Sequence, residues 1–94
     1  MNQTEKEILS ILQEECAEVI QAVSKCDRFG LDNYKPGKPK TNRQHLAEEL
    51  GDLQAMIDLC KSHLIITEED VIVASQNKLA KLQQWSNIFK IEKI

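Results

Sequence analysis

Two short clusters of carboxylates have the spacing of residues that share one face of an α-helix. Glu14, Glu15 and Glu18 form the first cluster, and Glu49 and Asp52 form the second. Residues three and four apart on a helix are neighbours, so each cluster places its side chains side by side. If two such helices pack together, the carboxylates repel one another and lose solvation unless a cation binds. All-oxygen ligands of this kind suit Mg²⁺ or Mn²⁺ rather than Zn²⁺.

The first cluster requires a long amphipathic helix. Thr4 followed by Glu7 is a capping-box pattern that predicts the start of this helix, and Gly30 suits its end. Apolar residues recur at the helical period between these positions, and Glu15 is expected at the edge of the apolar stripe. The stripe consists of Ile8, Leu12, Val19, Val23 and Cys26, broadened by Leu9, Cys16 and Ile20.

The second cluster requires a second helix, which is expected to begin at Thr41 or Asn42. Residues 30–41 contain both prolines and all but one of the glycines, so they predict a loop between the two helices. Glu49 is expected at the margin of a narrow apolar seam, with Asp52 beside it. That seam consists of Leu46, Leu50, Leu53, Ile57, Cys60 and Leu64.

A third helix is predicted from Thr67 and Asp70, which form its cap, to about residue 89. Val71, Ile72 and Val73 are β-branched and favour a strand, but a lone strand would have no partner. The chain is therefore predicted to be one all-α domain over residues 1–94, a helical hairpin plus a third helix. A hairpin of this kind leaves an apolar flank, which predicts a four-helix-bundle-type homodimer or homotetramer.

The overall composition excludes several classes of partner. A net charge of −3 is too small to indicate a nucleic-acid or membrane partner. No apolar run approaches the roughly 20 residues of a membrane span, and no signal-peptide pattern is present at the N-terminus. The three cysteines form no Cys-x-x-Cys motif, which favours reduced thiols. We therefore expect a soluble, cytoplasmic protein.

The two acidic clusters and the end of the first helix together resemble a known family. The pattern Glu-Glu-x-x-Glu, a basic spacer and Glu-x-x-Asp is similar to the MazG-like branch of the all-α nucleoside triphosphate pyrophosphohydrolases. The similarity includes Lys-x-x-Arg-Phe-Gly at the end of the first helix and covers residues 7–60. The matching residues are Glu14, Glu15, Glu18, Lys25, Arg28, Phe29, Gly30, Glu49 and Asp52.

This resemblance implies hydrolysis of a nucleoside triphosphate to the monophosphate and pyrophosphate, with Mg²⁺ or Mn²⁺ as cofactor. Glu14 and Glu15 are then the catalytic candidates, Glu14 as a ligand of a second ion, as a base, or as a solvated residue. The implied metal ligands are Glu15, Glu18, Glu49 and Asp52. The implied substrate-binding residues are Lys25, Arg28, Asn77, Lys78 and Lys81.

Other interpretations of the same residues stay open. Each acidic cluster alone suits a solvated helix face, and cations near a helix C-terminus suit the helix dipole. The rival functions are a phosphoribosyl-ATP pyrophosphohydrolase-like enzyme and a non-catalytic helical metal-binding interaction module. His45 is expected at the surface rather than as a ligand, since a ferritin-like site needs Glu-x-x-His on two helices. Core packing or loop anchoring is expected for Phe29, Tyr34 and Trp85, in preference to stacking on a base.

Overall fold

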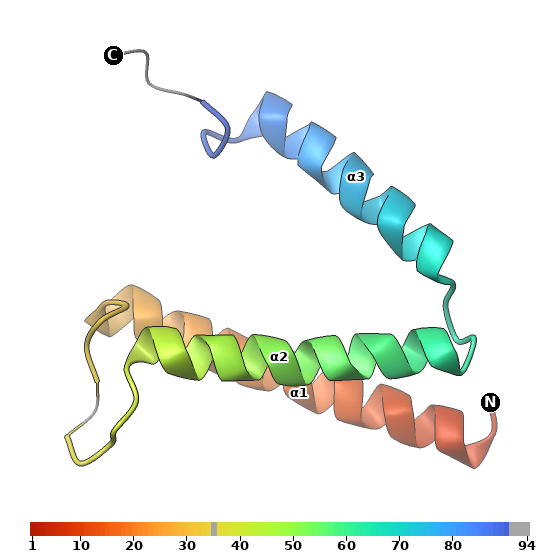
Figure 1. Ribbon diagram of the computed structural model, residues 1–94, viewed down its shortest axis with the longest axis horizontal. Helices are drawn as coiled ribbons and strands as arrows, with labels where there is room; N and C mark the ends of the chain where they lie inside the picture. The colour runs from red at the N-terminus through yellow and green to blue at the C-terminus, as the bar shows by residue number, and fades with distance from the viewer. Residues whose placement is uncertain (35, 91–94) are drawn as a thin grey trace.

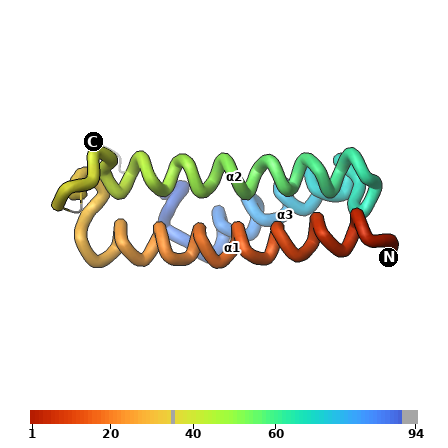
Figure 2. The backbone as a smooth tube through the Cα atoms, turned by 90° about the horizontal axis from the view of Figure 1, so that it is seen from below, coloured from red at the N-terminus to blue at the C-terminus, as the bar shows by residue number. Residues whose placement is uncertain are grey.

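The computed structural model describes residues 1–34 and 36–90, and this part of the chain contains three α-helices and no strand. The helices are α1 (Gln3–Phe29), α2 (Asn42–Ser62) and α3 (Glu68–Trp85). α1 and α2 run antiparallel and lie side by side along their length, and α3 leads away from them (Figures 1 and 2). The prediction of an all-α chain with a helical hairpin and a third helix is confirmed.

The first helix begins earlier than its predicted cap. The side-chain oxygen of Asn2 accepts a hydrogen bond from the backbone N–H of Glu5 at 2.8 Å. The backbone N–H of Asn2 in turn donates to the Glu5 carboxylate at 2.9 Å. The predicted Thr4–Glu7 capping box is therefore wrong, because Asn2 and Glu5 form the same reciprocal arrangement one half-turn earlier.

The caps of the other two helices agree with the prediction. The hydroxyl of Thr41 accepts a hydrogen bond from the backbone N–H of Gln44 at 3.1 Å, so α2 begins at Asn42. The hydroxyl of Thr67 accepts one from the backbone N–H of Asp70, also at 3.1 Å. α3 ends at Trp85, which is short of the predicted end near residue 89.

The turn after α2 contains a leucine in a left-handed backbone conformation. Leu64 has φ of 56°, which is usually a glycine position because a Cβ crowds the following carbonyl group. The backbone N–H of Leu64 donates to the carbonyl oxygen of Lys61 at 3.0 Å, and that of Ile65 to Cys60 at 2.9 Å. The Leu64 side chain is 80% exposed, so its predicted place in the apolar seam is wrong.

The core of the hairpin is small. Ile8, Met56 and Cys60 form a buried cluster near the N-terminal end of α1, with partly buried neighbours packed around it. Those neighbours are Leu9, Ile11, Leu12 and Ile65. Ala22 is buried farther along α1. Met56 was not among the predicted core residues, although it is one of the most buried in the described part of the chain.

The contact line between the two helices passes through the acidic residues. Ile8, Glu15 and Ala22 are seven residues apart and therefore lie along one side of α1, and Ile8 and Ala22 are buried there. Glu49 and Met56 have the same spacing on α2. Glu15 and Glu49 thus occupy positions that apolar residues fill elsewhere in the seam. The prediction that Glu49 lies at the margin is wrong, because the Glu49 side chain is only 15% exposed.

A second apolar side of the hairpin is open to solvent. Ile20, Val23 and Leu50, all expected in the seam or stripe, are exposed large apolar residues. α3 has no buried residue, and Figure 1 shows it leading away from α2. The radius of gyration is 16.7 Å, whereas a compact domain of this length has about 12 Å. Among the described residues, no helix has both the length and the hydropathy of a membrane span.

Candidate active site

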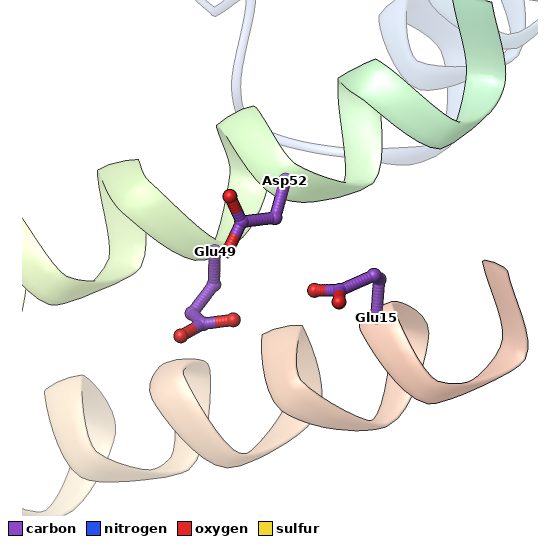
Figure 3. Close-up of side chains that lie close together, drawn as sticks. All are labelled: Glu15, Glu49 and Asp52. Carbon is purple, nitrogen blue, oxygen red and sulfur yellow. The ribbon is translucent and has the colours of Figure 1, made fainter. Parts of the chain in front are cut away.

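Three carboxylates from the two helices of the hairpin converge in the middle of the seam. Glu15 extends from α1, and Glu49 and Asp52 extend from α2, as Figure 3 shows. One oxygen atom of each side chain lies within 4.8 Å of the others. We call these three residues the acidic trio. The trio lies where α1 and α2 are in contact, so the hairpin itself determines its geometry.

Two of the three carboxylates in the acidic trio have no positively charged partner among the described residues. Within the described residues, neither Glu15 nor Asp52 forms an ion pair. The pKa of Glu15 is raised above its ordinary value of 4.5, first by desolvation and then by repulsion from Asp52, Glu49, Glu18 and Glu14. The folded hairpin therefore favours whatever reduces this negative charge, either a proton or a cation.

The size and chemistry of the acidic trio fit a small divalent cation. Mg²⁺ binds oxygen ligands at about 2.0–2.1 Å, so two of its ligands lie roughly 3–4 Å apart. Oxygen atoms within 4.8 Å of one another reach that separation through small side-chain rotations. The absence of a thiol or imidazole in the trio favours Mg²⁺ or Mn²⁺ over Zn²⁺.

The other two carboxylates of the first cluster lie outside the acidic trio. Glu14 and Glu18 are exposed on α1 and do not belong to the group of oxygen atoms within 4.8 Å. Both are nevertheless close enough for their charges to raise the pKa of Glu15. The structure thus brings together three of the five predicted carboxylates and places the remaining two at the periphery.

His45 contacts the acidic trio, contrary to the expectation of a surface residue. Its Nε2 atom lies 3.2 Å from the Oε1 atom of Glu49, and the imidazole is half-buried. An N–H at Nε2 is therefore within reach to donate a hydrogen bond to this carboxylate and to hold it in position. The signal was present in the sequence, because His45 stands four residues before Glu49 on the same helix face.

A basic cavity of ≈ 510 Å³ adjoins the acidic trio and shares His45 with it. Its lysines are Lys25, Lys38 and Lys40. Lys40 pairs with Glu48, whereas Lys25 and Lys38 have no acidic partner among the described residues. The full lining is Lys25, Lys38, Pro39, Lys40, Asn42, His45 and Glu48. Two uncompensated ammonium groups in one cavity attract an anion of high charge, such as a polyphosphate.

The remaining predicted substrate-binding residues lie elsewhere. The guanidinium of Arg28 stacks over the ring of Phe29, at 4.9 Å from the ring centroid, and does not line the basic cavity. Asn77, Lys78 and Lys81 are exposed on α3, which leads away from the hairpin (Figure 1). Within a single chain, the structure therefore does not bring these three residues to the acidic trio.

The fold and the site together define a class of protein. The chain is an all-α hairpin in which carboxylates from facing helices converge, and a cavity with lysines that are unpaired within the described part of the chain lies beside them. These features suit a metal-dependent protein that binds phosphate esters. In agreement with this class, residues 3–85 match the MazG nucleotide pyrophosphohydrolase domain, so the chain belongs to the MazG family. Enzymes of this family hydrolyse nucleotides to release pyrophosphate and generally depend on divalent cations. Searches of curated proteins and of solved structures gave no match.

Proposed function

We propose that this protein hydrolyses a nucleoside or deoxynucleoside triphosphate to the monophosphate and pyrophosphate, with Mg²⁺ or Mn²⁺ as cofactor. The observation that carries the proposal is the acidic trio, in which Glu15 and Glu49 replace apolar residues of the seam at a cost in packing and solvation and Asp52 lies exposed beside them. A helix contact without a bound cation would gain stability from apolar residues at these positions. The trio is therefore best explained by a function that needs it.

The carboxylates divide into ligands and assisting groups. Glu15, Glu49 and Asp52 are the primary ligands, and Glu18 is the candidate for a further ligand because it follows Glu15 by one helical turn. When bound, a divalent ion neutralises phosphate oxygens and lowers the pKa of coordinated water. Glu14, which is exposed on the same helix as Glu15, is the candidate to accept a proton from the attacking water or to bind a second ion.

The basic cavity is proposed to hold the phosphate chain. Lys25 and Lys38 have no acidic partner among the described residues, so their ammonium groups are free to pair with phosphate oxygens. His45 lines this cavity and lies 3.2 Å from Glu49, which supports a binding mode in which the phosphates lie next to the proposed ion.

We further propose that the active form is a homodimer or homotetramer. The accessible surface of 7747 Å² exceeds that of a typical folded monomer of this mass by roughly 2,000 Å². Much of the exposed surface of the helices is apolar, including Ile20 and Val23 of α1 and Ile72 of α3. In a four-helix-bundle assembly, α3 of one copy would bring its Asn77, Lys78 and Lys81 to the acidic trio of a neighbouring copy.

The decisive experiment measures pyrophosphate release from a panel of nucleoside and deoxynucleoside triphosphates, with Mg²⁺ and with chelator. We expect ion-dependent release that collapses in Asp52→Asn, which keeps the side-chain shape and removes one ligand charge. Glu7→Gln is the matched control, because Glu7 is exposed on α1 two turns from Glu15. Full activity in Asp52→Asn would refute the assignment of the site. Ion binding without pyrophosphate release would instead indicate a non-catalytic metal-binding module.

A further inference from the structure

A second cavity lies beyond the basic cavity, where the loop folds back on the ends of α1 and α2. It has a volume of ≈ 400 Å³ and is lined by Lys25, Arg28, Phe29, Asn33, Tyr34, Pro36 and Asn42. Phe29 and Tyr34 are 56% and 58% exposed, so the predicted packing of these two residues into a core is wrong. Exposed aromatic side chains that line a cavity are typical of a binding site for a flat, apolar ligand.

The cavity is held by a hydrogen-bonded frame. The backbone N–H of Asn42 donates to the carbonyl oxygen of Asn33, and that of Arg43 donates to Leu31, both at 2.8 Å. The Asn42 side-chain amide donates to the carbonyl oxygen of Gly30 at 2.9 Å. Arg43 also pairs with both carboxylate oxygens of Asp32, at 3.0 and 3.2 Å. These bonds tie residues 30–33 to the first turn of α2 and so hold the part of the loop that leads to Tyr34.

The polar groups of the cavity suit a base rather than a phosphate. The side-chain oxygen of Asn42 forms no hydrogen bond with a described residue and is available as an acceptor for an exocyclic amine. The guanidinium of Arg28 already stacks over Phe29 and extends a planar surface along the cavity wall. Planar aromatic and guanidinium groups are the surfaces on which bases stack.

The two cavities and the acidic trio follow one another along the hairpin. Lys25 and Asn42 line both cavities, so the two share a wall. The basic cavity in turn meets the trio through His45. The order is thus aromatic walls, then lysines, then carboxylates. A nucleoside triphosphate with a divalent ion has its groups in the same order: base and sugar, then phosphates, then the ion.

We propose that this second cavity, which we call the nucleoside cavity, binds the base and sugar of the nucleotide substrate through stacking on Tyr34 and Phe29. This inference rests on the proposed function, since it assigns the other end of the same substrate. Tyr34 is the only tyrosine in the chain. Its ring signals in a nuclear magnetic resonance spectrum therefore report on this cavity without any requirement for turnover.

The test titrates the full-length protein, in the presence of Mg²⁺, with a nucleoside monophosphate and separately with inorganic pyrophosphate. We expect the monophosphate to shift the Tyr34 ring signals in a saturable manner and pyrophosphate to leave them unchanged. Tyr34→Leu is expected to weaken monophosphate binding about tenfold or more, in the range found when a stacked aromatic ring is removed. Pyrophosphate binding by the same variant should be unaltered.

Two variants distinguish stacking from a general disturbance of the loop. Tyr34→Phe keeps the ring and should restore monophosphate binding. Leu31→Ala changes an exposed residue of the same loop that does not line the cavity, and it should bind as the wild type does. Equal weakening in Leu31→Ala, or a loss of pyrophosphate binding in Tyr34→Leu, would overturn the inference.

The outcomes separate this inference from the proposed function. If the protein hydrolyses nucleotides and Tyr34→Leu leaves KM unchanged for every nucleotide, the nucleoside cavity is refuted and the proposed function stands. If no nucleotide is hydrolysed but the monophosphate still shifts the Tyr34 ring signals, the cavity stands and the proposed function fails.

Discussion

Replacement of Glu15 by glutamine is expected to change the stability of the free hairpin and of the ion-bound hairpin in opposite directions. In the free protein, desolvation and the neighbouring carboxylates raise the pKa of Glu15 above 4.5. The folded state then binds a proton more tightly than the unfolded state does. The contribution of Glu15 to stability is therefore fully present below pH 4.5 and is lost as the pH rises through the raised pKa. Glu15→Gln lacks this loss, so at neutral pH the free variant should be more stable than the wild type.

With a divalent ion, the order reverses. An ion that binds only the folded state at one hundred times its Kd adds about 2.7 kcal/mol to the free energy of unfolding. For a domain of this size that corresponds to a rise in Tm of roughly 10–20 °C. Glu15 supplies one of three converging carboxylates, and its loss should weaken Kd at least about tenfold. At the same ion concentration the gain then falls to about 1.4 kcal/mol, or half of the shift in Tm.

Thermal unfolding with Mg²⁺, with Mn²⁺ and with chelator measures both effects. Glu7→Gln is the matched control, since it removes one exposed carboxylate from the same helix and should behave as the wild type does in both states. An unchanged Tm of the wild type across an ion titration would refute ion binding by the acidic trio. An equal rise in Glu15→Gln and the wild type would exclude Glu15 from the ligands.

Three further predictions follow from other parts of the chain. Arg43 lowers the pKa of Asp32 below its ordinary value of 3.8. The ion pair therefore stabilises the fold above pH 3.8, and this stabilisation is lost as the pH falls through the lowered pKa. Asp32→Asn should lower Tm slightly at neutral pH and leave Tm unchanged at a pH below the lowered pKa. Leu64→Gly should stabilise the protein by about 0.5–1 kcal/mol in chemical unfolding, because relief of the left-handed backbone outweighs the added chain entropy; a lower unfolding midpoint would show that Leu64 is covered in the assembly. Lys25→Ala should raise KM several-fold in the pyrophosphate assay, with a smaller fall in kcat. The reason is that the Lys25 ammonium group faces phosphate charge that is already present before the transition state. An unchanged KM would exclude Lys25 from phosphate binding.

The helices and their order were predictable from local signals in the sequence. Thr41 and Thr67 cap their helices as predicted, and Gly30, with φ of 92°, ends α1. These features depend on hydrogen bonds within four residues, which a sequence pattern contains. Where two patterns competed, as at Asn2 and Thr4, the sequence alone did not determine which residue would serve as the cap.

The exact line of contact between the helices was not predictable, and for this reason Glu15 was predicted at the edge of the apolar stripe instead of on the contact line. The mean direction of the apolar stripe on α1 combines two faces, one against α2 and one that carries the exposed Ile20 and Val23. That average displaced Glu15 to the edge of the stripe, whereas its seven-residue spacing from buried Ile8 and Ala22 places it on the contact line. The direction of α3 relative to the hairpin and the exposure of Trp85 likewise depend on tertiary packing, which the residue pattern of one helix does not determine.

If Glu15 and Glu49 hold the proposed ion, their placement in the seam implies that catalysis and stability compete in this hairpin. Because both carboxylates stand where Ile8, Ala22 and Met56 stand in neighbouring layers, an aliphatic side chain at either position would extend the apolar packing between the helices. The same change would remove a ligand of the proposed ion. One aliphatic substitution at either position is therefore expected to give a more stable hairpin that no longer binds the ion.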